Sequence, residues 1–378
     1  MALNVVSSDR LSTNVKTSNL GTYLSDTVGS NKNLIINGAF NIAQRGTTST
    51  SSGFQTVDRF AVYYTGTDEA PTQAKHALTS SDTGPWAKGL RCSYHITNGN
   101  QTSGAGAGDY IYLSHKIEAQ NMAQSGWDYT SSSSSVTLSF WIKSSVAQNF
   151  YGYLKTSDGT SQNYPFETGS LSAATWTKIT KTIPGHANIQ FDLDANMGVE
   201  VVIAPFFGTD KTGTITLNAW GAWASATRLP NNTSTWYTTN DSTLEITGVQ
   251  LEIGETATEF EHRSYGEELR RCQRYLQVTD DGGCGIGSCA STSAGQRIQM
   301  DLKTTMRASP TVTKIGNNIY VFDGTNAGQV SATSAEYGTP HSIEWEFSSM
   351  AAGSVATGRP CIGYINGSAG GFKMEAEM

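Results

Sequence analysis

Apolar and polar residues alternate over short runs along most of the chain, and a period of two predicts β-strands. The clearest runs are YIYLSHKI (residues 110–117), SVTLSFWI (135–142) and WTKITKTI (176–183). Turn-rich stretches such as TNGNQTSGAGAGD separate them. About eleven runs of this kind precede residue 254, at the spacing expected of a β-sandwich.

The last of these runs changes phase in its middle. Leu244 and Ile246 share one face, whereas Leu251 and Ile253 fall on the other. Gly248 stands at the switch, and an extra residue at a glycine is how a β-bulge re-registers a strand. We therefore predict one continuous strand that bends at Gly248.

A helical period replaces the strand pattern after residue 261. Ser264 is a candidate N-cap, and Glu267 follows three residues later, as in a capping box. A helix this short is marginal by itself, so its apolar stripe must pack against something. The residues of that stripe, at helical spacing, are Tyr265, Leu269, Cys272 and Leu276.

This helix divides the chain into parts. We predict an N-terminal arm over residues 1–33, a β-sandwich over 34–261, a linker helix over 262–277 and a smaller β-sandwich over 278–378. The fold class is therefore all-β. The arm has no helical or strand period, so we expect another chain to order it. Its anchoring aliphatic residues would be Leu3, Val5, Val6, Leu11 and Leu20.

Composition narrows the class of protein. Charged residues make up 15% of the chain, aromatic residues 10%, and the net charge is −7. No run of Lys and Arg exceeds two residues, which argues against a nucleic-acid partner. No apolar stretch reaches the length of a membrane span, and the N-terminal residues lack the apolar core of a secretion signal. We expect a protein made and folded in a cytosol.

Catalytic motifs are missing from the sequence. It contains no GxSxG, no HExxH, no phosphate-binding loop and no CxxC pair. His115 falls on the apolar face of its run, which favours a core histidine over a general base. We therefore predict no enzyme activity, no catalytic residue and no cofactor.

Two acidic pairs are the alternatives to that prediction. Glu344 and Glu346 share one face of a predicted strand, where a glycosidase pair would need a less exposed setting. Asp192 and Asp194 resemble the start of a calcium loop, but their alternation with apolar residues favours a half-exposed strand. We predict no metal site.

Aromatic residues gather in WGAWASATRLPNNTSTWYTTND (residues 220–241). Aromatic rings beside Asn and Asp suit stacking on sugars, and the alternative is that they seal one end of the sandwich. The candidate glycan-binding residues are Trp223, Trp236 and Tyr237.

Three segments together resemble a known family. NLIINGAFNIAQRG (33–46), VDRF (57–60) and TGVQLEIGETATEFEHRSYGEELRRCQRYLQ (247–277) are similar, in sequence and order, to recurrent pieces of tailed-bacteriophage fibre and other virion-surface proteins. In that family this block is a jelly-roll sandwich of the carbohydrate-binding kind, followed by a variable distal β domain. KTTMRASPTV (303–312) resembles the start of such distal domains.

The resemblance implies a structural protein of the virion surface, assembled in the host cytoplasm. It would be a homotrimeric fibre or spike, with a tail fibre favoured, that attaches to other virion proteins through the arm and binds a host-surface glycan. A capsid decoration protein, a head fibre and a particle-borne polysaccharide depolymerase are the alternatives. The trimer would place Tyr265, Leu269, Cys272 and Leu276 on its threefold axis, unless the stripe packs on its own sandwich.

Overall fold

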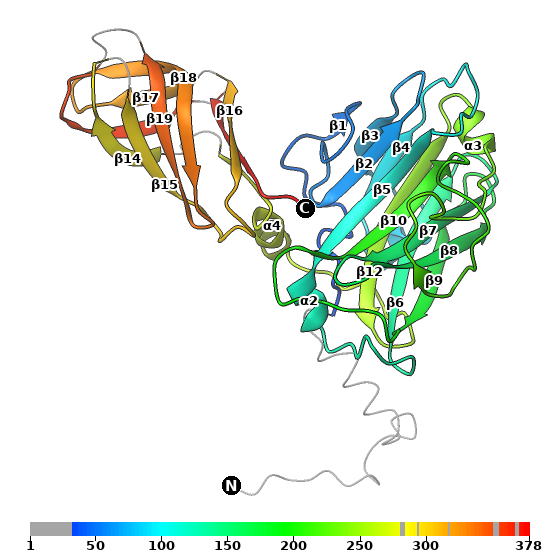
Figure 1. The fold of residues 1–378 in the computed structure, drawn as a ribbon. Helices are drawn as coiled ribbons and strands as arrows, with labels where there is room; N and C mark the ends of the chain where they lie inside the picture. Colours follow the sequence, from blue (N-terminus) through cyan, green and yellow to red (C-terminus); the bar gives the residue numbers. More distant parts are fainter. Residues whose placement is uncertain (1–31, 280–283, 293–294, 317, 351–354, 367–369) are drawn as a thin grey trace, which may run out of the picture.

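A computed structural model describes residues 32–279, 284–292, 295–316, 318–350, 355–366 and 370–378. Two six-stranded antiparallel sheets pack face to face, and a smaller β domain follows them (Figure 1). The predicted all-β sandwich class is confirmed. Leu3, Val5, Val6, Leu11 and Leu20 lie outside the described residues. Within these residues no helix is both long and apolar enough to span a bilayer.

We call the two sheets A and B. Sheet A contains, in spatial order, β1 (Thr48–Ser49), β3 (Thr72–Ala77), β4 (Cys92–Thr97), β12 (Thr243–Ile253), β6 (Ser135–Ser144) and β9 (Thr177–Pro184). Sheet B contains β11 (Gly221–Ala222), β8 (Gln162–Ser170), β7 (Asn149–Thr156), β10 (Met197–Phe207), β5 (Tyr110–Glu118) and β2 (Phe60–Thr65). Short helices lie in the connections between these strands: η2 (Trp86–Lys88), α2 (Ala119–Ala123) and α3 (Thr235–Thr238).

The inner faces of the two sheets form the core. The alternation read from the sequence holds in β5, where Ile111, Leu113 and Ile117 are buried. His115 is buried with them, and its Nδ1 lies 3.1 Å from the carbonyl oxygen of Arg59. Burial, and then the Arg59 charge, hold the pKa of His115 well below its ordinary value. His115 is therefore a neutral core residue, as expected.

The predicted bulge in β12 is confirmed. Gly248 has a φ of 63°, and the pairing of β12 with β6 shifts register between Thr247 and Gln250. The apolar residues of NLIINGAFNI (33–42) predict a first strand, but this segment instead crosses the bulge without regular structure. Gly38 lies against it so closely that a Cβ would come within 2.0 Å of the Val249 carbonyl oxygen. This close approach requires glycine.

The helix α4 (Tyr265–Gln273) joins the two β domains (Figure 1). Ser264 caps it by accepting a hydrogen bond from the Glu267 backbone N–H. The predicted stripe does not form a free face, because Cys272 and Leu276 are both 0% exposed within the single chain. Leu276 has also left the helix and belongs to β13.

The placement of Cys272 and Leu276 on a threefold axis is therefore wrong. Cys272 and Leu276 instead pack within their own chain, which was the alternative to the trimer contact. Tyr265 is 64% exposed and Leu269 is half-buried, so their role in a trimer stays a prediction.

A cluster of buried charges fixes α4 to the sandwich. Arg274, which follows the helix, donates to both carboxylate oxygens of Glu118 at 2.7 and 2.8 Å, and Tyr275 Oη donates to the same group at 2.5 Å. The Arg59 guanidinium lies 3.3 Å from the centroid of the Tyr275 ring. Burial raises the pKa of Glu118, but the bonds from Arg274 and Tyr275 outweigh it and lower that pKa.

The second domain differs from the predicted sandwich. Its strands close into a six-stranded barrel, with a three-stranded sheet beside it. The barrel order is β14 (Cys284–Cys289), β15 (Gln296–Asp301), β19 (Ser342–Met350), β18 (Ala327–Gly338), β17 (Ile319–Phe322) and β20 (Pro360–Ile365). The sheet order is β13 (Leu276–Thr279), β21 (Gly370–Glu375) and β16 (Thr311–Gly316). Short strands with one apolar face each satisfy both architectures, so the strand pattern alone does not separate them.

The residues after β21 return to the sandwich and contact it beside β2, where the chain ends in Figure 1. Glu377 pairs with Arg59 and, at 3.2 Å, with Arg45. Glu375 lies 3.0 Å from Arg45. From the barrel side, Arg307 donates to the Ala195 carbonyl oxygen at 2.9 Å. Ion pairs and hydrogen bonds thus join the barrel to the sandwich.

We expect Glu118→Gln to lower the free energy of unfolding by about 2 kcal/mol, because it leaves the half-buried Arg274 guanidinium without the anionic partner that it has in buried Glu118. The matched control is Glu267→Gln on α4, whose exposed carboxylate pairs with Arg270 and Arg271. Loss of such surface pairs costs about 0–1 kcal/mol. Urea denaturation followed by circular dichroism measures both, and equal losses would contradict the assigned role of Glu118.

Candidate functional site

The outer face of sheet B carries a group of aromatic side chains. They arise from strand alternation: in β5 the odd-numbered residues enter the core, which turns Tyr110 and Tyr112 outward. Tyr63 projects from the neighbouring edge strand β2, and Phe207 ends β10. The full set, which we call the aromatic face, is Tyr63, Tyr110, Tyr112, Tyr151, Tyr153, Phe207 and Trp223.

Six of the seven rings of the aromatic face contact one another in two groups, and Tyr151 packs beside them. Tyr112 lies 5.4 Å from both Tyr63 and Phe207 and 5.5 Å from Tyr110, measured between ring centroids. Tyr153 and Trp223 form the second group at 5.3 Å. These separations are typical of favourable aromatic pairs. Phe207 and Tyr153 are buried, whereas the other five rings are half-buried and present part of their surface to solvent.

Charged side chains border the two aromatic groups. Arg228 joins them, because its guanidinium lies 5.6 Å from the Phe207 centroid and 5.3 Å from the Trp223 centroid. Lys155 Nζ lies 4.7 Å from the Trp223 centroid. Glu200 is fixed by Ser114, whose hydroxyl donates to its carboxylate at 2.7 Å. Fixed hydrogen-bonding groups beside apolar surface are the usual composition of a ligand site.

The phenols of Tyr63 and Tyr112 stay protonated at neutral pH. Burial, followed by the negative charge of Glu200, raises the pKa of both Tyr63 and Tyr112. Each hydroxyl is therefore a neutral group that can donate one hydrogen bond and accept others.

Only one of the three predicted glycan-binding residues lies on this face. Trp223 does, and it is half-buried. Trp236 and Tyr237 are both 0% exposed: Trp236 donates from its indole N–H to the Thr243 carbonyl oxygen at 3.0 Å, and Tyr237 bonds Asp109 at 3.0 Å. The glycan-binding assignment of Trp236 and Tyr237 is wrong, because α3 turns them into the core, where they seal one end of the sandwich.

Sequence reasoning missed the other members of the aromatic face. They come from four strands, and a search for aromatic residues close in sequence does not join them. The signal was present in β5, where YIYLSHKI has aromatic residues at outward positions. Polar residues are usual at the solvent side of an antiparallel strand, so outward tyrosines mark a surface with another use.

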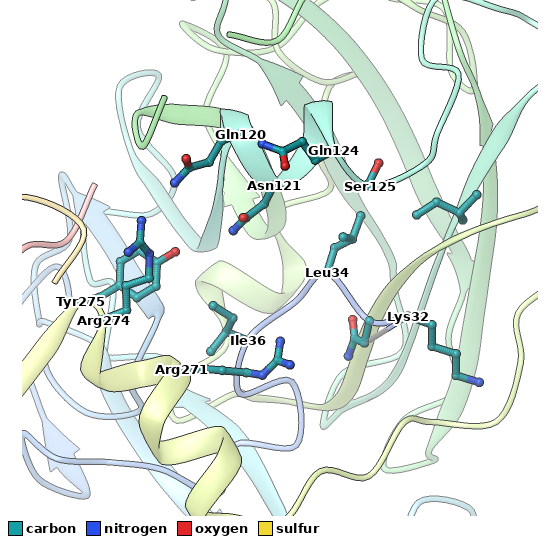
Figure 2. Close-up of a pocket in the computed structure, with 12 residues that line it drawn as sticks. Lys32, Leu34, Ile36, Gln120, Asn121, Gln124, Ser125, Arg271, Arg274 and Tyr275 are labelled. Atoms are coloured by element: carbon teal, nitrogen blue, oxygen red, sulfur yellow. The ribbon is translucent and has the colours of Figure 1, made fainter. Parts of the chain in front are cut away.

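A polar cavity of about 880 Å³ lies between α2 and the end of α4 (Figure 2). It is lined by residues of the segment 32–36, by α2 with its following turn, by Ile253 at the end of β12, and by the end of α4 with the two residues after it. Its named side chains are largely amides and cations, among them Gln120, Asn121, Gln124, Arg271 and Arg274. Among the described residues that line it, the only ring is that of buried Tyr275, so these residues offer less surface for stacking than the aromatic face does.

The acidic pairs considered from the sequence do not form a recognisable site. Glu344 and Glu346 lie 3.6 and 3.5 Å from Arg297 on the barrel surface, 40% and 31% exposed. Asp192 and Asp194 lie in the irregular segment before β10 rather than in a strand, and Asp194 is bonded by Asn196. Other possible metal ligands, His76, His95 and Glu245, meet on sheet A.

Comparison with solved structures returns β-sandwich proteins. A tailspike protein 4 domain of bacteriophage CBA120, described as enzymatically active, matches with a TM-score of 0.31 and 10% identity over 59% of this chain and 22% of that one. The N-terminal cellulose-binding domain of Cellulomonas fimi β-1,4-glucanase C matches with a TM-score of 0.27 and 10% identity over 57% of this chain and 99% of that one.

A tandem CBM22 domain of Paenibacillus barcinonensis has a TM-score of 0.26 and 8% identity over 89% of this chain and 96% of that one. This chain spans only a small part of the tailspike domain, and at these scores none of the likenesses tells what it binds. No protein-family model matches the chain, and no curated protein matches its sequence.

Proposed function

We propose that the protein is a non-enzymatic component of a phage virion surface, a fibre or spike with a tail fibre favoured, whose sandwich binds a host-surface glycan through the aromatic face. The aromatic face is the observation that supports glycan binding, since it combines partly exposed rings with fixed charged groups. The virion half is supported by the sequence resemblance of residues 33–46, 57–60 and 247–277.

Sugars suit such a surface for a physical reason. One side of a pyranose ring carries C–H groups that pack on an aromatic ring, while its edge carries hydroxyls that need hydrogen bonds. Trp223 and Tyr63 supply the rings. Lys155, Arg228 and Glu200 supply donors and acceptors at the border, so an oligosaccharide lying across sheet B would meet both kinds of group.

The test is binding of the full chain to an array of bacterial capsular and O-chain oligosaccharides. We expect Tyr63→Ala and Trp223→Ala each to weaken binding about tenfold, since losing one stacked ring removes about 1.4 kcal/mol. Trp86→Ala is the matched control: Trp86 is also half-buried and stacked by an arginine, at 3.8 Å, but it covers sheet A. Binding that Trp86→Ala weakens as much as Trp223→Ala would overturn the assignment, as would a failure to bind any glycan.

The alternatives differ from this proposal in what they require. A depolymerase requires a pair of carboxylates in an apolar setting. Glu344 and Glu346, the pair considered from the sequence, are exposed and paired with Arg297. A capsid decoration protein or head fibre uses the same domains at another place on the particle, and imaging of intact virions distinguishes it from a tail fibre.

Self-association is part of the proposal, and the barrel offers a surface for it. Ile286, Ile362 and Phe322 lie side by side on β14, β20 and β17, because Ile362 pairs with both of the others. They are 75%, 47% and 37% exposed. A row of three exposed apolar side chains across neighbouring strands is typical of an interaction surface.

We expect Ile362→Asp to convert the homotrimer into a folded monomer in analytical ultracentrifugation, because three copies of the charge would be buried at the contact. Its side chain points away from the barrel core, so circular dichroism should not change. Ile315→Asp, at an exposed apolar residue of β16, is the control. A monomeric wild-type protein would contradict self-association, and a trimeric Ile362→Asp variant would exclude this surface.

Attachment to the particle is proposed for residues 1–33. Deletion of residues 1–30 should leave the sandwich folded, because it keeps every core residue of the part of the chain that the structure describes, the first of which is Ile35. The truncated protein should be missing from purified virions while it accumulates in the infected cell, as measured by immunoblotting of both fractions. Normal occupancy of the truncated protein on particles would contradict the anchoring role.

A further inference from the structure

Three possible metal ligands meet on the outer face of sheet A. His76 projects from β3, His95 from β4 and Glu245 from β12, three strands that are adjacent in the sheet. Glu245 lies directly across from His95 in the register, and His76 is two residues beyond Ala74, the partner of His95 on β3. Residues two apart on a strand share a face, so all three side chains point the same way.

The donor atoms are close enough to share one ion. One ligand atom from each residue can be chosen so that all three lie within 4.8 Å of one another. His76 Nδ1 lies 3.1 Å from one carboxylate oxygen of Glu245, and His95 Nδ1 lies 3.7 Å from the other. Ligands bound to zinc at about 2.0–2.1 Å in a tetrahedron are separated by somewhat more than 3 Å, so small side-chain movements would suffice.

The Nδ1 atom of His95 is well placed to bind a cation. Its Nδ1 is buried and has no hydrogen-bond partner, although it faces Glu245. Its other nitrogen, Nε2, lies 3.1 Å from Thr97 Oγ1. In the tautomer whose Nε2–H donates to this hydroxyl, Nδ1 carries a lone pair on the side of the Glu245 carboxylate, where a cation can bind both groups.

We propose that His76, His95 and Glu245 bind a divalent transition-metal ion, of which Zn²⁺ fits the ligands best. Two imidazoles and one carboxylate are ligands that zinc accepts, and hard cations such as Ca²⁺ and Mg²⁺ prefer oxygen alone. The His76 side chain is 55% exposed, so solvent reaches the fourth position. The ion would join three strands of sheet A, and such a site goes beyond the glycan-binding proposal.

The groups around Glu245 show how a metal ion could replace the positive charge that now pairs with it. Lys143 Nζ lies 2.8 Å from a Glu245 oxygen, where it competes with a metal, but it also lies 3.1 Å from Asp82. Asp82 can therefore keep Lys143 when a metal takes Glu245. Ser93 donates to the second Glu245 oxygen at 2.9 Å and orients the carboxylate.

The experiment uses the full chain, freed of metal by a chelator and titrated with Zn²⁺ by calorimetry and with Co²⁺ by visible absorption. We expect one site per chain and a higher Tm when Zn²⁺ is bound. His76→Ala should weaken Zn²⁺ binding by about 100-fold or more, since changes in outer-shell groups alone cost about 10- to 100-fold. His341→Ala, at an exposed histidine of the barrel domain, should change nothing.

We expect Lys143→Gln to change the Zn²⁺ affinity in the direction opposite to His76→Ala. It removes the competing cation and should tighten Zn²⁺ binding, which a merely structural role of this cluster would not produce. His76 is largely exposed, so its substitution should not prevent folding, and circular dichroism checks this. Absence of saturable Zn²⁺ or Co²⁺ binding, or binding that His76→Ala leaves unchanged, would overturn the proposal.

Discussion

The buried guanidinium of Arg59 is the contact on which the arrangement of the domains depends. Arg59 stacks on the ring of Tyr275, pairs with Glu377 and donates to the carbonyl oxygen of Lys116. It therefore contacts the segment after α4, the residues that return from the barrel and strand β5 at once. A buried charge must have such partners, since its desolvation is otherwise very unfavourable. Removing the residues that return from the barrel would take away Glu377, the anionic partner that this charge has among the described residues.

The need to place partners around Arg59 explains why the helix α4 lies between the two β domains. The helix α4 is too short to be stable alone, and its apolar stripe is too narrow to form a domain core. It packs instead on the sandwich through Cys272, and its end positions Arg274 and Tyr275 over Glu118. The helix connects the two domains within one chain, and for that reason Cys272 and Leu276 are not available to a neighbouring copy.

The outer faces of the two sheets are used differently. Sheet A is covered in part by aromatic residues of the connections, including Trp86 and Phe260, which pack with Trp141 against a small apolar cluster of Ala39, Leu78 and Leu90. The cluster around Glu245 lies elsewhere on this sheet, and the His76 side chain there is 55% exposed. Sheet B keeps its own tyrosines at the surface. The covered sheet thus suits a small ion held by polar side chains, whereas the other suits a ligand that lies across rings.

The sequence by itself determined the strands, the bulge at Gly248, the N-cap at Ser264 and the core position of His115, because each depends on neighbours along the chain. The tertiary structure decided which surfaces those strands share. Trp236 and Tyr237 looked like neighbours of Trp223, yet α3 turns them into the core. His76, His95 and Glu245 are scattered in sequence, and only the pairing of β3, β4 and β12 brings them together. The second domain was predicted to be a sandwich, yet its strands close into a barrel. Strands of one pattern can do either, and long-range pairing alone selects between the two.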